Sequence, residues 1–230
     1  MATDTNADMS HQNGIVYQFG EFVDSLQKNG PFSTARKVGQ RLYYKYKRVD
    51  FSTQNIYDLT RVGNYENHGT AFVSTSKDFL KRVVDDLEIS IGKPLVKELF
   101  VDYGSGKGSA IIHARDIGFK EAIGVEFALE LHEIAESNIE KMNLKGVQSV
   151  YADATTYPLP LDASVVYLFN PFDEIVMGKF IENIVKEKEN FKGDVYFIYK
   201  NASCDILKKY LEFIDEITYP SGSTAQFYKL

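Results

Sequence analysis

The apolar residues of this chain follow two alternating patterns from position 76 onward. Helical spacing appears first, in a segment for which Ser74, Thr75 or Ser76 is the expected N-cap. Its apolar face consists of Phe79, Leu80, Val83, Val84 and Leu87. Short apolar runs typical of buried strands follow at 99–103, 122–126, 147–151, 164–169 and 195–199, and helical periodicity separates most of them. This alternation predicts an α/β protein with a parallel sheet and helices on both faces.

The C-terminal end of the chain departs from this alternation. Residues 213–219 and 224–230 both have the composition of strands, and the Pro-Ser-Gly-Ser sequence at 220–223 suits a tight reversal. We therefore predict a terminal hairpin that makes one edge of the sheet antiparallel.

The N-terminal third is organised differently. Residues 1–13 are polar and are predicted to be disordered, 14–28 show helical spacing, and 50–72 have no clear period. These patterns divide the chain into a disordered tail, a helical N-terminal arm at 14–72 and a main domain at 73–230.

The composition of the chain excludes several classes of site and function. Of its 230 residues, 44% are hydrophobic and 25% are charged, which is ordinary for a globular protein. The single cysteine, Cys204, excludes an intramolecular disulfide and a thiolate zinc cluster. The four histidines show no paired ligand spacing, so no metal site is predicted. A net charge of −6 argues against a protein that coats nucleic acid generally.

The same sequence carries no sign of export or membrane insertion. No run approaches the 18 or so apolar residues of a membrane span, and the polar N-terminus resembles neither a signal nor a transit peptide. We expect a cytoplasmic protein that does not contact membranes.

A glycine-rich loop lies between the first predicted strand and the helix after it. It reads Val101-Asp102-Tyr103-Gly104-Ser105-Gly106-Lys107-Gly108. A phosphate-binding loop would need glycine at 101 and Ser or Thr at 108, and a nicotinamide fingerprint would need glycine at 109; each pattern fails. The remaining pattern, Asp-x-Gly-x-Gly-x-Gly, is similar to the S-adenosylmethionine loop of class I methyltransferases. The structural alternative is a tight turn that holds no ligand.

The loop chemistry suits that cofactor. Glycines at 104, 106 and 108 let the backbone approach the methionine part closely. The helix that begins near Lys107 offers free N–H groups and its positive dipole end to the cofactor carboxylate, with Ser105 in the same loop. Asp102 is placed to meet the cofactor ammonium.

Further polar residues stand at the ends of the next strands. Glu126 ends the second strand, where an acid accepts both ribose hydroxyls of an adenosine. Asp153-Ala154 follows the third strand and is expected at the adenine amino edge, and Asn170 follows the fourth. Open α/β sheets bind ligands at the carboxyl ends of their strands, so these groups are predicted to share one site.

From about Asn64 to Leu230 the chain therefore resembles the class I methyltransferases. Its motifs, VDxGSGKG, GVE and NPF, are most like those of bacterial members without an assigned substrate, and the non-SET histone lysine methyltransferases are distantly similar. The resemblance implies a Rossmann-like seven-stranded sheet of order 3-2-1-4-5-7-6 with strand 7 antiparallel. It also implies that residues before the helix at 76 cover the cofactor, with Tyr65, His68 or Thr75 as lining residues.

The acceptor side is represented by Asn170-Pro171-Phe172. It resembles the Asn/Asp-Pro-Pro-aromatic motif of amino-group methyltransferases, in which the Asn oxygen and the first Pro carbonyl accept N–H bonds from the target nitrogen. Here the aromatic comes one residue earlier, at Phe172, where it is expected to stack on a flat target or to cap an alkylamine. The alternative is that Pro171 ends the strand and Asn170 caps the next helix.

A second possible contact surface lies at 31–48. It holds six basic residues and no acidic one, together with Tyr43, Tyr44 and Tyr46. The basic residues are Arg36, Lys37, Arg41, Lys45, Lys47 and Arg48. The segment is either a nucleic-acid or acidic-partner surface, or a solvated helix face packed through its tyrosines.

The sequence thus predicts an S-adenosylmethionine-dependent methyltransferase that yields S-adenosylhomocysteine. A nitrogen of a protein side chain or small amine is the preferred acceptor, with O-methylation or nucleic-acid methylation as alternatives. The alternative of a different class is a non-catalytic module that binds the cofactor or RNA.

Overall fold

The computed structural model describes residues 30–32, 34–54, 59–62 and 73–230. The chain divides into two units, Met1–Val49 and Asp50–Leu230. In the first unit, residues 30–47 are helical apart from position 33, which is not described. The predictions for 1–13 and 14–28 lie outside the described residues, as do Tyr65 and His68.

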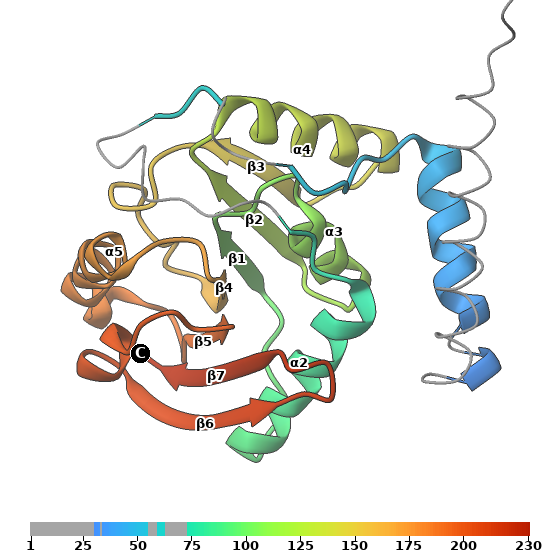
Figure 1. Ribbon diagram of the computed structural model, residues 1–230. Helices are drawn as coiled ribbons and strands as arrows, with labels where there is room; N and C mark the ends of the chain where they lie inside the picture. Colours follow the sequence, from blue (N-terminus) through green and yellow to red (C-terminus); the bar gives the residue numbers. More distant parts are fainter. Residues whose placement is uncertain (1–29, 33, 55–58, 63–72) are drawn as a thin grey trace, which may run out of the picture. The chain divides into compact units, whose positions relative to one another are not determined.

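The second unit is built on a seven-stranded sheet (Figure 1). Its strands are β1 (Leu99–Tyr103), β2 (Glu121–Glu126), β3 (Val147–Tyr151), β4 (Ala163–Phe169), β5 (Tyr196–Lys200), β6 (Glu212–Thr218) and β7 (Thr224–Lys229). They lie in the order β3-β2-β1-β4-β5-β7-β6; β1 to β5 are parallel, and β7 is antiparallel to both β5 and β6. The predicted fold and the terminal hairpin are confirmed.

In the described part of this unit, four longer helices and two short 3-10 turns surround the sheet. The helices are α2 (Lys77–Ile91), α3 (Ser109–Asp116), α4 (Leu129–Met142) and α5 (Glu174–Lys186), and the turns are η1 (Lys188–Asn190) and η2 (Ile206–Lys209). Ser76 caps α2 by accepting the Phe79 N–H, as one of the three predicted caps. Gly92 ends α2 in the left-handed conformation that glycine adopts at little cost.

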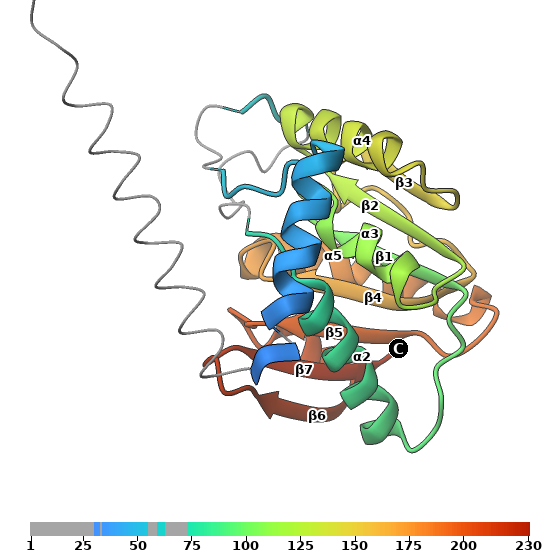
Figure 2. The same cartoon turned by 90° about the vertical axis from the view of Figure 1, so that its right-hand side faces the viewer.

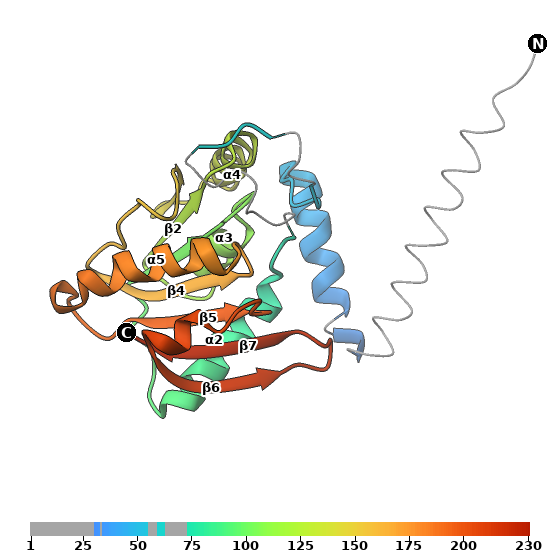
Figure 3. The same ribbon diagram turned by 60° about the vertical axis from the view of Figure 1, so that its left-hand side comes forward.

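The sheet is buried on both faces. Alternate side chains of β1 point to opposite sides: Phe100 joins the core under α2 and α3, whereas Val101 and Tyr103 join the core under α5. Figure 2 shows α2 and α3 on one side of the sheet, and Figure 3 shows α5 on the other. Burial on both faces explains why these strands appear in the sequence as continuous apolar runs.

Candidate active site

A cavity of about 180 Å³ opens at the carboxyl ends of β1, β2 and β4. The predicted site residues that line it are Asp102, Gly104, Ser105, Gly106, Glu126, Asn170 and Pro171, and Thr75 joins them from the residues before α2. Its other lining residues are Val73, Ser109, Ala110, Phe127, Leu131, Tyr167 and Phe169. The structure therefore brings together groups from both the proposed cofactor side and the proposed acceptor side.

Asp102 lies on the central strand and is buried at the base of this cavity. Its neighbours in the sheet are Gly124 on β2 and Tyr167 on β4. Among the described residues its Oδ1 atom has no hydrogen-bond partner. Burial, with a smaller contribution from the charge of Glu126, raises the pKa of Asp102 well above its usual range. Because a buried acceptor without a donor is costly, Asp102 is suited to a donor that a ligand brings.

Glu126 ends β2 and is also buried, but its carboxylate is partly satisfied by the backbone. It accepts the Gly106 N–H at 2.7 Å and the Ala128 N–H at 2.9 Å. Burial raises the pKa of Glu126 to about 7, and these backbone bonds oppose the rise. Phe127 contributes a further backbone hydrogen bond to this carboxylate. An ionised carboxylate has about four acceptor positions, so acceptor capacity remains for donors such as hydroxyl groups.

The glycine loop needs its glycines for conformation and for close packing. Gly104, Gly106 and Gly108 have φ values of +82°, +52° and +80°, a region that other residues adopt only with strain. A Cβ atom on Gly104 would lie 2.6 Å from Cβ of Pro171. The loop after β1 therefore packs directly against the loop after β4, which joins the two halves of the site.

Gly104→Ala is expected to destabilise the protein by about 2–4 kcal/mol, because left-handed strain adds to overpacking against a rigid proline. Gly92→Ala is the matched control, since Gly92 has φ +68° but an added Cβ would meet nothing within 4 Å. Urea unfolding of both variants separates the two contributions. Equal losses in the two variants would show that the contact between Gly104 and Pro171 does not constrain the site.

Lys107 lies in the glycine loop but not in the cavity. Its side chain is 2% exposed, and its ammonium donates to the carboxylate of Asp50 at 2.8 Å and to the Ser52 hydroxyl at 3.0 Å. The Asn138 amide donates to the carbonyl oxygens of Asp50 and Lys107. Lys107 therefore anchors the 50–52 segment onto the domain through its side chain, and its predicted contact with the cofactor stays a prediction.

A second segment, at 59–62, pairs with the residues that follow Glu126. Val62 donates its N–H to the Phe127 carbonyl, and Leu129 donates its N–H to the Thr60 carbonyl. The sequence of this region has no clear period, so the pairing could not be predicted from it. Phe127 and Leu131 were not predicted as site residues, although they follow Glu126 closely in the sequence.

The side chains at the end of β4 and just after it lie in different surroundings. Asn170 has φ +43° and lines the cavity, whereas Phe172 is buried in the core with its ring centroid 6.0 Å from that of Phe180. Phe169, which precedes Asn170, is the aromatic residue of this segment that lines the cavity. Asp173 accepts the N–H groups of Ile175 and Val176, so α5 has Asp173 and not Asn170 as its N-cap.

The remaining predicted residues lie outside the cavity lining. Asp153 accepts hydrogen bonds from the backbone N–H and hydroxyl of Thr155, and Ala154 is buried in the core. Gly108 forms the N-cap of α3. The proposed contact between Asp153 and an adenine ring stays a prediction.

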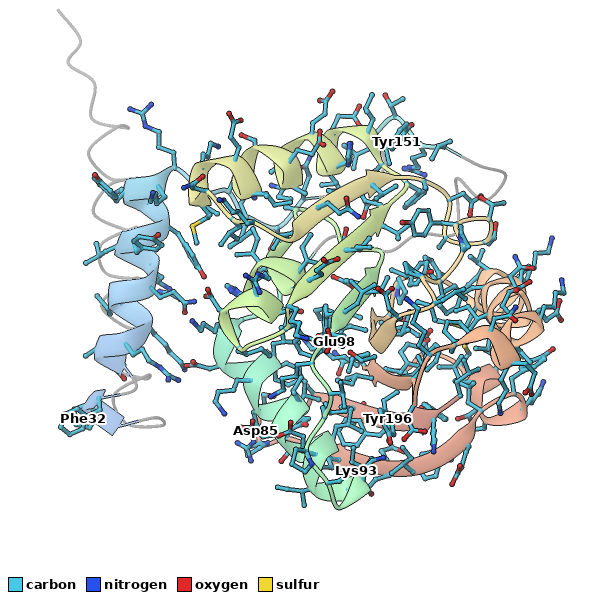
Figure 4. The ribbon with its side chains drawn as sticks, turned by 180° about the vertical axis from the view of Figure 1, so that it is seen from behind. Phe32, Asp85, Lys93, Glu98, Tyr151 and Tyr196 are labelled. Atoms are coloured by element: carbon cyan, nitrogen blue, oxygen red, sulfur yellow. The ribbon has the colours of Figure 1, made fainter. Side chains whose placement is uncertain are left out.

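A larger cavity, of about 500 Å³, involves other elements and includes Lys93, Glu98 and Tyr196 in its lining (Figure 4). Among its charged groups, Asp194 pairs with Lys93 and Lys229, and Glu98 pairs with Lys120. None of its lining residues has a buried side-chain atom without a hydrogen-bond partner, whereas Asp102 in the cavity at β1, β2 and β4 has one.

The described residues contain no cluster of three or more His, Cys, Asp or Glu side chains arranged to hold a metal ion. None of their helices has the length and apolar character required to cross a membrane.

No family model and no curated protein matches the chain. Among solved structures, a S-adenosylmethionine-dependent methyltransferase from Clostridium acetobutylicum ATCC 824 is similar at 11% identity, with a TM-score of 0.53, over 68% of this chain and 92% of that protein. A SAM dependent methyltransferase from Aquifex aeolicus is 15% identical over 68% and 99%, with a TM-score of 0.48. An RNA methyltransferase from Salinibacter ruber, in complex with S-adenosyl-L-homocysteine, is 18% identical over 68% and 93%, with a TM-score of 0.46. The first of these shows that the two proteins share a fold.

Proposed function

We propose that this protein is a methyltransferase that uses S-adenosylmethionine and transfers the methyl group to a nitrogen of a protein side chain or a small amine. The observation that carries the proposal is the pair of buried carboxyl groups, Asp102 and Glu126, on either side of a left-handed glycine loop. The fold shared with a methyltransferase supports it.

The residues around the cavity fit the functional groups of this cofactor. Asp102, which has an unpartnered buried oxygen, would accept the cofactor ammonium. Glu126 retains acceptor capacity for the two ribose hydroxyls, and Phe127 and Leu131 supply apolar wall beside it. The glycine loop and the N-terminus of α3 would hold the cofactor carboxylate.

When bound, the cofactor supplies an electrophilic methyl group on a sulfonium. The protein must then place the acceptor lone pair in line with that group and exclude water. Asn170 lines the cavity next to Pro171, and its left-handed backbone turns the chain at the end of β4. The Asn170 side-chain oxygen and the Pro171 carbonyl would accept N–H bonds from the acceptor and so orient its nitrogen.

The helical segment within 31–48 favours nucleic acid as a second class of acceptor. Tyr46 is 82% exposed and Tyr43 is 45% exposed, among the basic residues of this segment. Exposed aromatic rings with basic neighbours are the groups that single-stranded nucleic acids contact.

Calorimetry tests the proposed cofactor and carries a pH signature. S-adenosylhomocysteine is expected to bind without added metal, and about tenfold more weakly at pH 6 than at pH 8. The reason is that burial raises the pKa of Glu126 to about 7, and its ionised form is the better acceptor for hydroxyl groups. Protonation below pH 7 therefore competes with binding, whereas higher pH adds little.

Glu126→Gln is the matched variant, because glutamine keeps the shape and does not titrate. It should bind more weakly at pH 8 and lose the part of the pH dependence that comes from Glu126, while any contribution from Asp102 remains. Absence of binding heat with both S-adenosylmethionine and S-adenosylhomocysteine would remove the cofactor proposal. Binding that required magnesium would instead indicate a metal-dependent O-methyltransferase.

A further inference from the structure

Lys200 is a buried lysine at the carboxyl end of β5, at the same end of the parallel strands as the cavity. It is the last residue of β5, paired in register with Phe169 of β4 and Ala225 of β7, and it is only 7% exposed. Phe169 is itself a cavity-lining residue, and Asn170 follows it directly. Lys200 therefore lies next to the proposed acceptor side and was not identified from the sequence.

Two aromatic rings hold the Lys200 ammonium. Its Nζ atom lies 3.4 Å from the centroid of Phe169 and 4.5 Å from that of Phe79 on α2. These rings stabilise a cation through their π faces, but they are not conventional hydrogen-bond acceptors. Within the described parts of the chain, the ammonium has no carboxylate or hydrogen-bond partner. Burial accordingly lowers the pKa of Lys200 to about 8, with no opposing contribution from a nearby acid.

Lys107 provides a comparison, because its buried ammonium is paired within the protein. It is similarly buried, and it is paired with a carboxylate and a hydroxyl. Buried charges are ordinarily paired in this way because an unpaired one is costly. The N–H donors of Lys200 have no acceptor among the described residues, and its Nζ atom is not among the fully buried atoms that lack a partner, so these donors are open to a ligand.

We propose that Lys200 binds an anionic group, a carboxylate or a phosphate, carried by the methyl acceptor close to the atom that is methylated. This inference rests on the proposed function and narrows it. Asn170 would orient the nucleophilic nitrogen, and Lys200 would hold the anionic group on the other side of Phe169. An acceptor that has only a cationic alkylamine would not satisfy the site.

The test follows the Lys200 ammonium directly by NMR in the full chain labelled with ¹³C at lysine Cε and saturated with S-adenosylhomocysteine. The pKa of Lys200 is measured in chloride, acetate and phosphate at equal ionic strength. Acetate or phosphate is expected to raise it by about one unit, because a nearby opposite charge favours the ammonium form. Lys81 is the internal control, since it is exposed and already paired with Asp85.

Each result has a defined meaning. A response to acetate alone indicates a carboxylate-bearing acceptor, a response to phosphate alone indicates a phosphate-bearing one, and a response to both supports a general anion site. No response, or an equal shift at Lys81, overturns the proposal. Lys200→Arg assigns the resonance by its loss while retaining the charge, and Lys200→Gln is the second variant for that assignment.

Calorimetry on the same sample separates this inference from the proposed function. Unchanged affinity of Lys200→Arg for S-adenosylhomocysteine, together with an anion response in the wild type, supports Lys200 as an acceptor-side residue. Binding of S-adenosylhomocysteine without any anion response would overturn the role of Lys200 and leave the proposed function standing. Failure to bind S-adenosylhomocysteine would overturn the proposed function, while the titration without it would still decide whether Lys200 binds anions.

Discussion

Asn170→Ala is expected to lower kcat by about 10²–10³-fold while the affinity for S-adenosylhomocysteine stays unchanged. The bond from an acceptor nitrogen to the Asn170 oxygen forms only when the acceptor is present, and it strengthens as positive charge develops on that nitrogen. The magnitude follows that of losing one aligned polar group that stabilises developing charge. Asn170→Asp should be milder, because it keeps an oxygen in place and adds a favourable charge.

Two controls separate the side chain of Asn170 from its backbone. Asn170 has φ +43°, so alanine there also introduces left-handed strain; Asn170→Gly removes the side chain without it. Asn143→Ala provides the same kind of strain at the end of α4, where φ is +52°. The prediction requires Asn170→Gly to be nearly as slow as Asn170→Ala, and Asn143→Ala to be as fast as wild type.

The measurement uses radiolabelled methyl transfer into a cell lysate, followed by separate treatment with protease and nuclease. Label in an ester or ether, or wild-type turnover by Asn170→Gly, would contradict nitrogen selection through Asn170. Label released only by protease would indicate a protein acceptor, and label released only by nuclease would favour nucleic acid and the exposed segment at 31–48. Label in small molecules would favour the small-amine alternative.

The fold could be predicted because its elements leave local signals. Strands such as Leu99–Tyr103 and Ala163–Phe169 are buried on both faces, so they appear as short apolar runs whatever lies next to them in space. The positions of Asp102 and Glu126 could be predicted for the same reason, since each carboxyl group follows such an apolar run; their contacts with a cofactor stay a prediction. Their positions at neighbouring strand ends follow from the parallel topology alone.

The functions of other residues depend on partners far away in the sequence. Lys107 was predicted to contact the cofactor, but its partner is Asp50, which lies 57 positions earlier in a segment without a period. Phe172 was predicted at the acceptor, but the left-handed turn at Asn170 precedes it, and Phe172 packs in the core beside α5. The contacts of Lys200 with Phe79 and Phe169 likewise could not be predicted from the sequence, because the two rings come from different elements.

Asp102→Asn is expected to stabilise the ligand-free protein while weakening S-adenosylhomocysteine binding by about 10–100-fold. The affinity loss corresponds to one charge-assisted hydrogen bond of about 1.5–3 kcal/mol to the cofactor ammonium. The stability gain follows from burial, which raises the pKa of Asp102 above its value in the unfolded chain. Folding therefore favours the protonated form of Asp102. The wild type loses stability as the pH rises from the pKa of Asp102 in the unfolded chain to its pKa in the folded protein. Asparagine does not titrate, so the variant does not lose stability in this way.

The pH dependence distinguishes this mechanism from an accidental improvement in packing. At pH 8 the variant should be more stable than the wild type and should have a higher Tm. The gain should shrink toward acidic pH, where Asp102 is protonated in both the folded and the unfolded wild type. Asp85→Asn is the control, because Asp85 is an exposed partner of Lys81 and its loss should slightly lower stability. Asp102 would be structural if the variant were less stable than the wild type at pH 8, or if it bound S-adenosylhomocysteine normally. The reason is that a buried carboxyl group that serves to bind a ligand lowers the stability of the ligand-free protein and raises that of the complex.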